Sequence, residues 1–116
     1  MNRLDGKTAL ISGASRGIGE AAARLMISVG ANVIIGDILK TKGEETAERL
    51  GPNAKFIHLD VTDENDWSNA VDLAVDQFGG LDILVNNAGL FLGRDFSDIS
   101  LDDWNRLANV NMTGVW

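Results

Sequence analysis

The chain has 116 residues, of which 45% are hydrophobic and 23% charged, a composition typical of one globular domain. Its formal net charge of −7 disfavours nucleic-acid and anionic membrane surfaces as partners, and no apolar run could span a membrane or serve as a secretory signal, so we expect a cytoplasmic protein. With no cysteine and one histidine, disulfides, zinc fingers, iron–sulfur clusters and thiol nucleophiles are excluded, and we expect no metal site.

Four short apolar runs predict the strands of a parallel sheet. They are Ala9–Ile11, Val33–Ile35, Phe56–Ile57 with Leu59, and Ile83–Val85. Each run is nearly unbroken rather than alternating with polar residues, which is typical of strands covered by helices on both faces.

Two longer stretches between these runs have apolar residues at helical spacing. Ile18–Val29 places its apolar residues on one face, and Trp67–Phe78 repeats the same offsets. For the second helix we expect Thr62 or Asp63 as the N-cap and the Gly79–Gly80 pair as the stop.

Two further helices are predicted with less regular patterns. One spans Thr41–Leu50, with Thr41 and Glu44 at the spacing of a capping box. The other begins after Ser100 and shows no stop signal before Trp116, so we expect the domain to continue beyond this sequence. Its apolar stripe consists of Trp104, Leu107, Ala108, Met112 and Val115.

A glycine-rich segment, Ser12-Gly13-Ala14-Ser15-Arg16-Gly17-Ile18-Gly19, follows the first predicted strand and opens the first predicted helix. Glycines there permit a tight turn and a close approach of backbone to a pyrophosphate, while a helix N-terminus attracts negative charge. The alternative is a plain strand-to-helix turn that is rich in glycine. From the strand–loop–helix context we predict a dinucleotide-binding loop formed by Gly13, Ser15, Arg16, Gly17, Ile18 and Gly19.

Asp37 ends the second predicted strand. In this type of unit an acidic side chain accepts hydrogen bonds from both hydroxyls of the adenosine ribose and repels a 2′-phosphate, which favours NAD over NADP. Arg16 could instead pair with a 2′-phosphate, so NADP stays open as the alternative cofactor. Without a cofactor, Asp37 would be an ordinary strand-end residue that caps the following turn.

Taken in order, these motifs resemble the N-terminal half of the short-chain dehydrogenase/reductase family. The resemblance rests on Gly13-x-x-x-Gly17-x-Gly19, Asp37, Asp60-Val61, Asn86-Asn87-Ala88-Gly89 and Asn111. It implies one NAD(P)-binding domain over residues 1–116. That domain would be α/β, with a doubly wound, Rossmann-like parallel sheet of strand order 3-2-1-4 that is incomplete on its C-terminal side. Ligands bind such sheets in the crevice where the strand order reverses.

The resemblance also implies roles for single residues. Asp60 would bind the adenine amino group beside Val61, while Asn87, Ala88 and Gly89 would line the cofactor's ribose. Asn111 would be the catalytic asparagine that holds a water in a proton relay. The residues themselves leave alternatives open: a helix-capping Asp60, a simple Asn-Gly turn, and a buried Asn111 hydrogen-bonded by its neighbours.

The family's chemistry also needs a serine, a tyrosine and a lysine, and this chain contains no tyrosine. We therefore interpret the chain as an N-terminal fragment that ends before these residues and is inactive by itself. His58, in the third predicted strand, is expected to be structural and far from the crevice.

For the intact protein, the resemblance implies an NAD-dependent oxidoreductase that interconverts a small secondary alcohol and a ketone. It would be a homo-oligomer, either a dimer or a tetramer. One alternative is a non-catalytic dinucleotide-binding module or sensor. Another is a flavodoxin-like domain with chance glycines.

Overall fold

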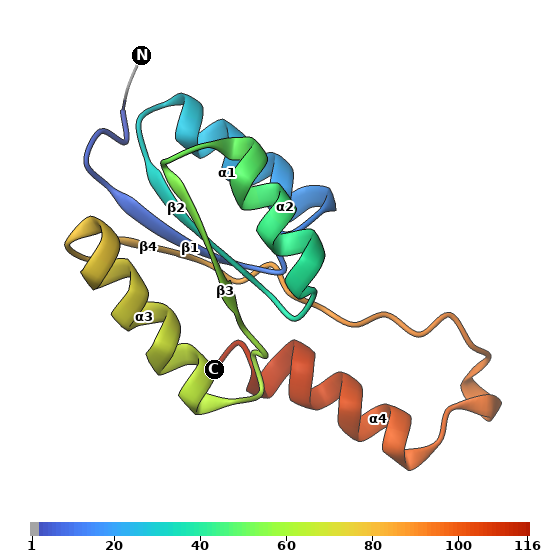
Figure 1. Ribbon diagram of the computed structural model, residues 1–116. Coiled ribbons are helices and arrows are strands. Elements are labelled where there is room, and N and C mark those ends of the chain that lie inside the picture. The colour runs from blue at the N-terminus through green and yellow to red at the C-terminus, as the bar shows by residue number, and fades with distance from the viewer. Residues whose placement is uncertain (1–2) are drawn as a thin grey trace.

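In the computed structural model, which describes residues 3–116, the chain forms a four-stranded parallel sheet (Figure 1). The strands are β1 (Thr8–Ser12), β2 (Asn32–Asp37), β3 (Ala54–His58) and β4 (Ile83–Val85). Their order in the sheet is β3-β2-β1-β4, so the predicted α/β class, parallel pairing and strand order are confirmed. Helical crossovers separate the strands along the chain, as parallel pairing requires.

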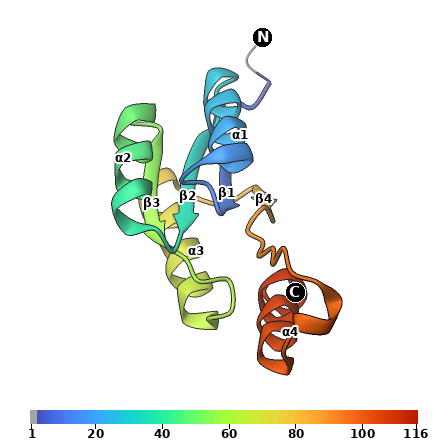
Figure 2. The same ribbon diagram turned by 90° about the vertical axis from the view of Figure 1, so that its right-hand side faces the viewer.

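Three of the helices cover the sheet: α1 (Gly17–Ser28), α2 (Lys40–Leu50) and α3 (Glu64–Phe78). The two views show α1 and α2 on one face and α3 on the other (Figures 1 and 2). Ile11 and Ile35 belong to the core shared with α1 and α2, whereas Leu10 and Ile34 belong to the core shared with α3. All four side chains are fully buried, each contributing about 1.5–3 kcal/mol of hydrophobic stabilisation.

The predicted boundaries of α3 are confirmed. The Asp63 side chain accepts hydrogen bonds from the backbone N–H groups of Asn65 and Asp66 at the N-terminus. Gly79 ends the helix in the left-handed conformation, with φ of 85°, which costs glycine nothing.

The predicted capping box at Thr41 and Glu44 is wrong. The helix α2 begins earlier, at Lys40, and its N-cap residue Leu39 makes no side-chain capping bond within the described structure. Instead, Asp37 Oδ1 accepts the N–H of Leu39 at 3.1 Å. This local turn leads the chain into the helix after only two intervening residues, Ile38 and Leu39, so the helix has already begun before Thr41.

Gly43 lies in the middle of α2, where glycine lowers helix stability, and the packing explains why it is there. A Cβ at this position would lie 2.2 Å from a carbon of the Phe56 ring on β3. The missing side chain therefore allows α2 to lie close against the edge of the sheet.

The last helix differs from its prediction. The helix α4 spans Leu101–Ala108 and then widens into a π-helix over Asn109–Thr113, instead of continuing as one regular helix. It stands away from the sheet beyond the ends of the strands (Figures 1 and 2), so its predicted apolar stripe finds little to pack on. Trp104 stays 63% exposed and Met112 71% exposed. In residues 3–116, no helix combines the length and apolar character needed to cross a membrane.

Candidate functional site

A cleft with a volume of about 800 Å³ lies at the carboxyl ends of the strands, between the sheet and α4. Its walls come from four segments that are far apart in the sequence: the glycine loop, the end of β2, residues 59–62 and residues 87–90, with α4 opposite them. The structure brings most of the sequence-predicted residues together here, namely Gly13, Arg16, Gly17, Asp37, Asp60, Val61, Asn87, Ala88 and Gly89. The other four do not line the cleft: Ser15, Ile18, Gly19 and Asn111.

Each of the three loop glycines meets a different physical requirement. A Cβ on Gly13 would lie 2.9 Å from the Cα of Ala88, and a Cβ on Gly19 only 2.5 Å from the carbonyl oxygen of Gly13. Gly17 has a φ of +61°, and a Cβ added there would have no neighbouring atom of the described residues within 4 Å. Two glycines therefore let backbone segments touch, while the third provides a left-handed turn beside open space.

The N-terminus of α1 faces this open space. Arg16 is its N-cap residue, with an extended backbone and no capping bond from its side chain to any residue described. Helix geometry leaves the N–H groups of the first turn, Gly17 to Gly19, without acceptors inside the helix, and the helix dipole adds partial positive charge. This arrangement suits an anion such as a pyrophosphate. The Ile18 side chain points outward and is 82% exposed.

Asp37 is 8% exposed and accepts three hydrogen bonds from its own chain. Its Oδ2 accepts the Ser15 N–H at 3.1 Å and the Ser15 hydroxyl at 2.6 Å, and its Oδ1 accepts the Leu39 N–H. Ser15 is fully buried, so it contacts Asp37 rather than the cleft. A carboxylate with two oxygens has about four acceptor positions, which leaves one on Oδ1.

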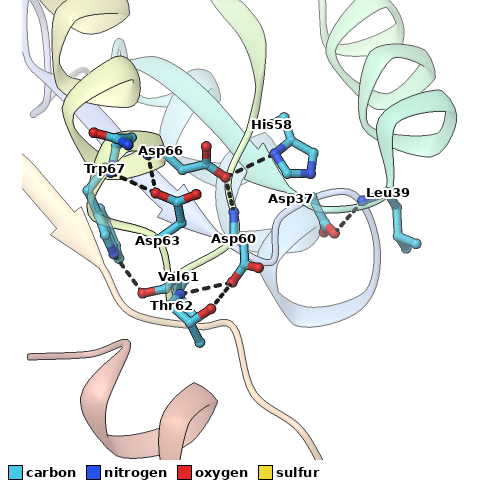
Figure 3. Close-up of polar contacts among 10 residues, drawn as sticks. Asp37, Leu39, His58, Asp60, Val61, Thr62, Asp63, Asp66 and Trp67 are labelled. Atoms are coloured by element: carbon cyan, nitrogen blue, oxygen red, sulfur yellow. Dashed lines mark hydrogen bonds and ion pairs between the residues drawn. The ribbon is translucent and has the colours of Figure 1, made fainter. Parts of the chain in front are cut away.

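Asp60 lies after β3 and holds a tight turn. Its Oδ1 accepts the hydroxyl of Thr62 at 2.6 Å and the Thr62 N–H at 2.9 Å (Figure 3). The bond from the Thr62 side chain, followed by the bond from its backbone, lowers the pKa of Asp60 below its ordinary value of 3.8. Partial burial opposes this shift, and the nearby His58 ring adds slightly to it.

His58 lies closer to the cleft than the sequence indicated. Its Nδ1 lies 3.0 Å from Asp66 Oδ2, and the same oxygen accepts the backbone N–H of Asp60 at 2.9 Å (Figure 3). The histidine therefore supports a cleft residue through Asp66, which agrees with a structural role. The expectation that it is distant from the crevice is wrong, because β3 ends at His58 and the chain enters the cleft wall at once.

Val61 is 9% exposed, and its position is fixed from two sides. Its carbonyl accepts the indole N–H of Trp67 at 2.9 Å (Figure 3). On the other side Gly114 packs so closely that a Cβ there would lie 2.6 Å from Val61 Cγ2. The end of the π-helix is thus seated on the base of the cleft.

Asn87 connects the segment after β4 to the glycine loop. Its Nδ2 donates to the carbonyl oxygens of Ser12 and Gly13, at 3.1 and 3.0 Å. The backbone N–H groups of Asn87 and Ala88 both donate to Ser12 Oγ. The side chain is therefore used to shape the cleft floor.

Asn111 holds Leu90, a residue of the cleft wall. Its Oδ1 accepts the Leu90 N–H at 2.7 Å, and its Nδ2 donates to the Leu90 carbonyl at 2.9 Å. The expectation that Asn111 is buried is wrong, since the π-helix leaves it exposed. The expected hydrogen bonds to neighbouring groups are present, with the backbone as partner.

Sequence reasoning missed the wall formed by α4. Polar residues at offsets 0, 3, 4 and 7 line the cleft, three of them in α4 and the last at the start of the π-helix: Asp102, Asn105, Arg106 and Asn109. That spacing is a helix face, so a search for polar rather than apolar periodicity would have found it. A capping box between Ser100 and Asp103 starts the helix. The Ser100 N–H is the main cause that lowers the pKa of Asp103, with burial opposing and Arg94 adding to the shift.

Comparison with known proteins identifies relatives of this chain. A family model described as short chain dehydrogenase matches residues 7–116. A 3-alpha-(or 20-beta)-hydroxysteroid dehydrogenase of Mycobacterium tuberculosis is 47% identical over 114 residues, which cover 98% of this chain and 44% of the relative. The trans-4-hydroxycyclohexanecarboxylate dehydrogenase of Sinomonas cyclohexanicum is 43% identical, with 97% and 47% covered.

A solved structure shows the same likeness in three dimensions. The 3-ketoacyl-(acyl-carrier-protein) reductase from Brucella melitensis, complexed with NADH, superimposes with a TM-score of 0.92 at 38% identity. The match covers 97% of this chain and 47% of that one. The chain therefore spans about half the length of the relatives that it matches.

Proposed function

This chain belongs to the short-chain dehydrogenase family, and on that basis we propose that it is the NAD-binding part of an oxidoreductase that interconverts a secondary alcohol and a ketone. The proposal rests mainly on one observation: the N-terminus of α1, which has no side-chain cap among the described residues, and the Asp37 carboxylate both lie on the walls of one cleft. A dinucleotide presents both matching groups, a pyrophosphate and a ribose diol.

The residues of the cleft fit such a cofactor. The N–H groups of Gly17 to Gly19 would hold the pyrophosphate, and the open space at Gly17 leaves room for it. Asp37 would bind the adenosine ribose, and Asp60 with Val61 the adenine. Ala88 and Gly89 would lie along the second ribose. When bound, the nicotinamide ring supplies or accepts the hydride, and the protein's part is to bind and orient it.

We infer NAD rather than NADP as the cofactor. A 2′-phosphate would lie against the Asp37 carboxylate, which is nearly buried and held by three donors, so the two negative charges would repel each other. Arg16 also lines the cleft, and its guanidinium could pair with a 2′-phosphate. Asp37 outweighs it, because its position is fixed by hydrogen bonds whereas Arg16 is exposed.

The names of two relatives, which include a hydroxysteroid and a hydroxycyclohexanecarboxylate, support a proposal for the substrate class. We propose a secondary alcohol, with ring-bound hydroxyls as the first compounds to test. Asn111 is proposed to take part in proton transfer through its place beside Leu90. Since the 116 residues include no tyrosine, we propose that this chain alone binds the dinucleotide but does not catalyse oxidation of the alcohol. The intact enzyme is proposed to be a cytoplasmic dimer or tetramer.

The test uses the full-length natural protein. NADH and NADPH are titrated separately by calorimetry, and cyclic secondary alcohols are then screened with NAD while NADH absorbance is followed. We expect tighter binding of NADH than of NADPH, and loss of that difference in Asp37→Ala. Absence of NADH binding would refute the proposal, whereas binding without turnover of any alcohol would favour a non-catalytic dinucleotide-binding module.

A further inference from the structure

A chain of buried hydrogen bonds connects α2 to Asp37 through the glycine loop. The Thr46 hydroxyl donates to the carbonyl oxygen of Ser15 at 2.6 Å, across 31 positions of sequence. The N–H and hydroxyl of Ser15 then donate to Asp37 Oδ2. Thr46 and Ser15 are both fully buried, so water cannot replace these bonds.

The Thr46 bond is a tertiary contact rather than a local one. A threonine inside a helix commonly donates to a carbonyl three or four residues earlier in the same helix. Here the hydroxyl reaches another segment instead, and its oxygen accepts a hydrogen bond from Arg49 at 3.4 Å. Arg49 in turn pairs with Glu20 of α1. The bond from Arg49 helps to hold the Thr46 hydroxyl in the orientation in which it donates to Ser15.

The contacts fix the Ser15 segment from both sides. Its carbonyl is held by Thr46 and its N–H by Asp37, while the preceding Ala14 N–H donates to the Gly36 carbonyl at 3.1 Å. The next residue, Arg16, is the N-cap of α1. A shift of the Ser15 carbonyl would therefore move both the Asp37 carboxylate and the start of the helix that faces the cleft.

We propose that Thr46 is a positioning residue for the adenosine ribose, acting through Ser15 on Asp37, and that it helps the cleft to prefer a 2′-hydroxyl over a 2′-phosphate. The inference rests on the proposed NAD binding. Without the Thr46 hydroxyl, the Ser15 carbonyl would be buried without its donor and would move to find another. The Asp37 carboxylate would then lose its fixed orientation towards the ribose.

The test compares dissociation constants for NADH and NADPH in the full-length protein. Thr46→Val removes the hydroxyl and keeps the shape, and we expect NADH to bind about fivefold to tenfold more weakly. NADPH affinity should change less, so the ratio of the NADPH dissociation constant to the NADH dissociation constant falls. Thr46→Ser keeps the donor and should restore the ratio to within about twofold. Thr41→Val, an exposed threonine of the same helix, is the matched control and should leave the ratio unchanged.

A double-mutant cycle separates positioning from general stability. If Thr46 acts through Asp37, Thr46→Val should have no effect on the ratio in an Asp37→Ala background. Ser15→Ala, which deletes only the Oγ bond to Asp37, should lower the ratio in the same direction and serves if Thr46→Val does not fold. Thermal melting of each variant records any loss of stability.

Two results would overturn the inference. One is an unchanged ratio of the NADPH to the NADH dissociation constant in Thr46→Val or Ser15→Ala, even where the melting temperature falls. The other is an equal effect of Thr46→Val with and without the Asp37 carboxylate. If wild-type protein binds neither dinucleotide, the proposed function itself fails and the inference with it, and that outcome differs from normal NADH binding with an unchanged ratio.

Discussion

Ser12 and Asn87, which lie 75 residues apart in the sequence, are joined by hydrogen bonds from Asn87 to both the side chain and the backbone of Ser12. The Asn87 N–H donates to Ser12 Oγ at 3.1 Å, and the Asn87 amide donates to the Ser12 carbonyl at the same distance. The end of β1 and the segment after β4 are thereby fixed to each other on the floor of the cleft. The geometry of the glycine loop depends on this junction as much as on its own residues.

Asn87→Ala should therefore destabilise the protein by about 1–3 kcal/mol, because two partly buried carbonyls lose their donor. Urea unfolding measures the loss. The control is Asn86→Ala, an exposed neighbour that should cost less than about 0.5 kcal/mol. Equal losses in the two variants would contradict the proposed importance of the junction.

Gly19→Ala should disturb the loop directly. The added Cβ would lie 2.5 Å from the Gly13 carbonyl oxygen, so backbone must move, at a cost of about 1–3 kcal/mol. Dinucleotide affinity should fall as well, because the loop positions the α1 N-terminus. Gly80→Ala is the matched control, since a Cβ there meets no described atom within 4 Å. Normal affinity in Gly19→Ala would show that the loop tolerates the shift.

Gly43→Ala should reverse the usual sign of a glycine-to-alanine change in a helix. Such a change normally stabilises by about 0.5–1 kcal/mol, but here the Cβ would meet the Phe56 ring at 2.2 Å. We expect net destabilisation in the wild-type background and stabilisation in a Phe56→Ala background. Thermal melts of wild type, both single variants and the double variant measure this difference. An equal change in melting temperature on Gly43→Ala in both backgrounds would exclude the ring as the cause.

Acid stability should depend on the bonds between Thr62 and Asp60. The folded-state pKa of Asp60 lies below its ordinary value of 3.8, so the group adds stability well above that pH and loses it as the pH falls through the folded-state pKa. Thr62→Val removes the hydroxyl donor, so the pKa of Asp60 in this variant should rise towards its ordinary value. Carboxyl NMR titration measures the shift, and urea unfolding should separate the variant from wild type at neutral pH but not at strongly acidic pH. Thr41→Val should show neither change.

Asn111→Ala should release the cleft wall at Leu90. The Asn111 side chain makes hydrogen bonds to both the N–H and the carbonyl of this residue. Amide hydrogen exchange at Leu90 should become about tenfold faster, while the amides of β1 keep their protection. The comparison is Asn105→Ala, which changes an exposed asparagine of α4 and should not alter exchange at Leu90.

The sheet and the first three helices could be predicted because their signals are local. Unbroken apolar runs such as Val33–Ile35 and a capping residue such as Asp63 need no knowledge of distant contacts. The π-helix after Ala108 could not be predicted in this way, because this segment contacts residues far away in the sequence: Asn111 bonds to Leu90, and Gly114 packs on Val61. The Thr41 capping box failed for a related reason, since Asp37 already directs the chain into α2.

The site divides along the same line. Gly13, Asp37 and Asp60, which the sequence suggested, line one cleft, since the carboxyl ends of parallel strands meet at the same end of the sheet. Motif spacing could not show that Ser15 turns away from the cleft to hold Asp37. Thr46 carried no signal at all, because its importance comes from one bond to a residue 31 positions earlier.

The two walls of the cleft differ in how closely they are tied to the core of the protein. Asp37 is the nearly buried last residue of β2, an inner strand of the sheet, and a change there also disturbs the packing of β2 and the glycine loop. Asn105 and Arg106 are exposed residues of α4, a helix that stands apart from the sheet (Figure 2), so changing them leaves the core intact. Evolution can therefore alter what the cleft accepts on the α4 side while the opposite wall, and the stability that depends on it, stays the same.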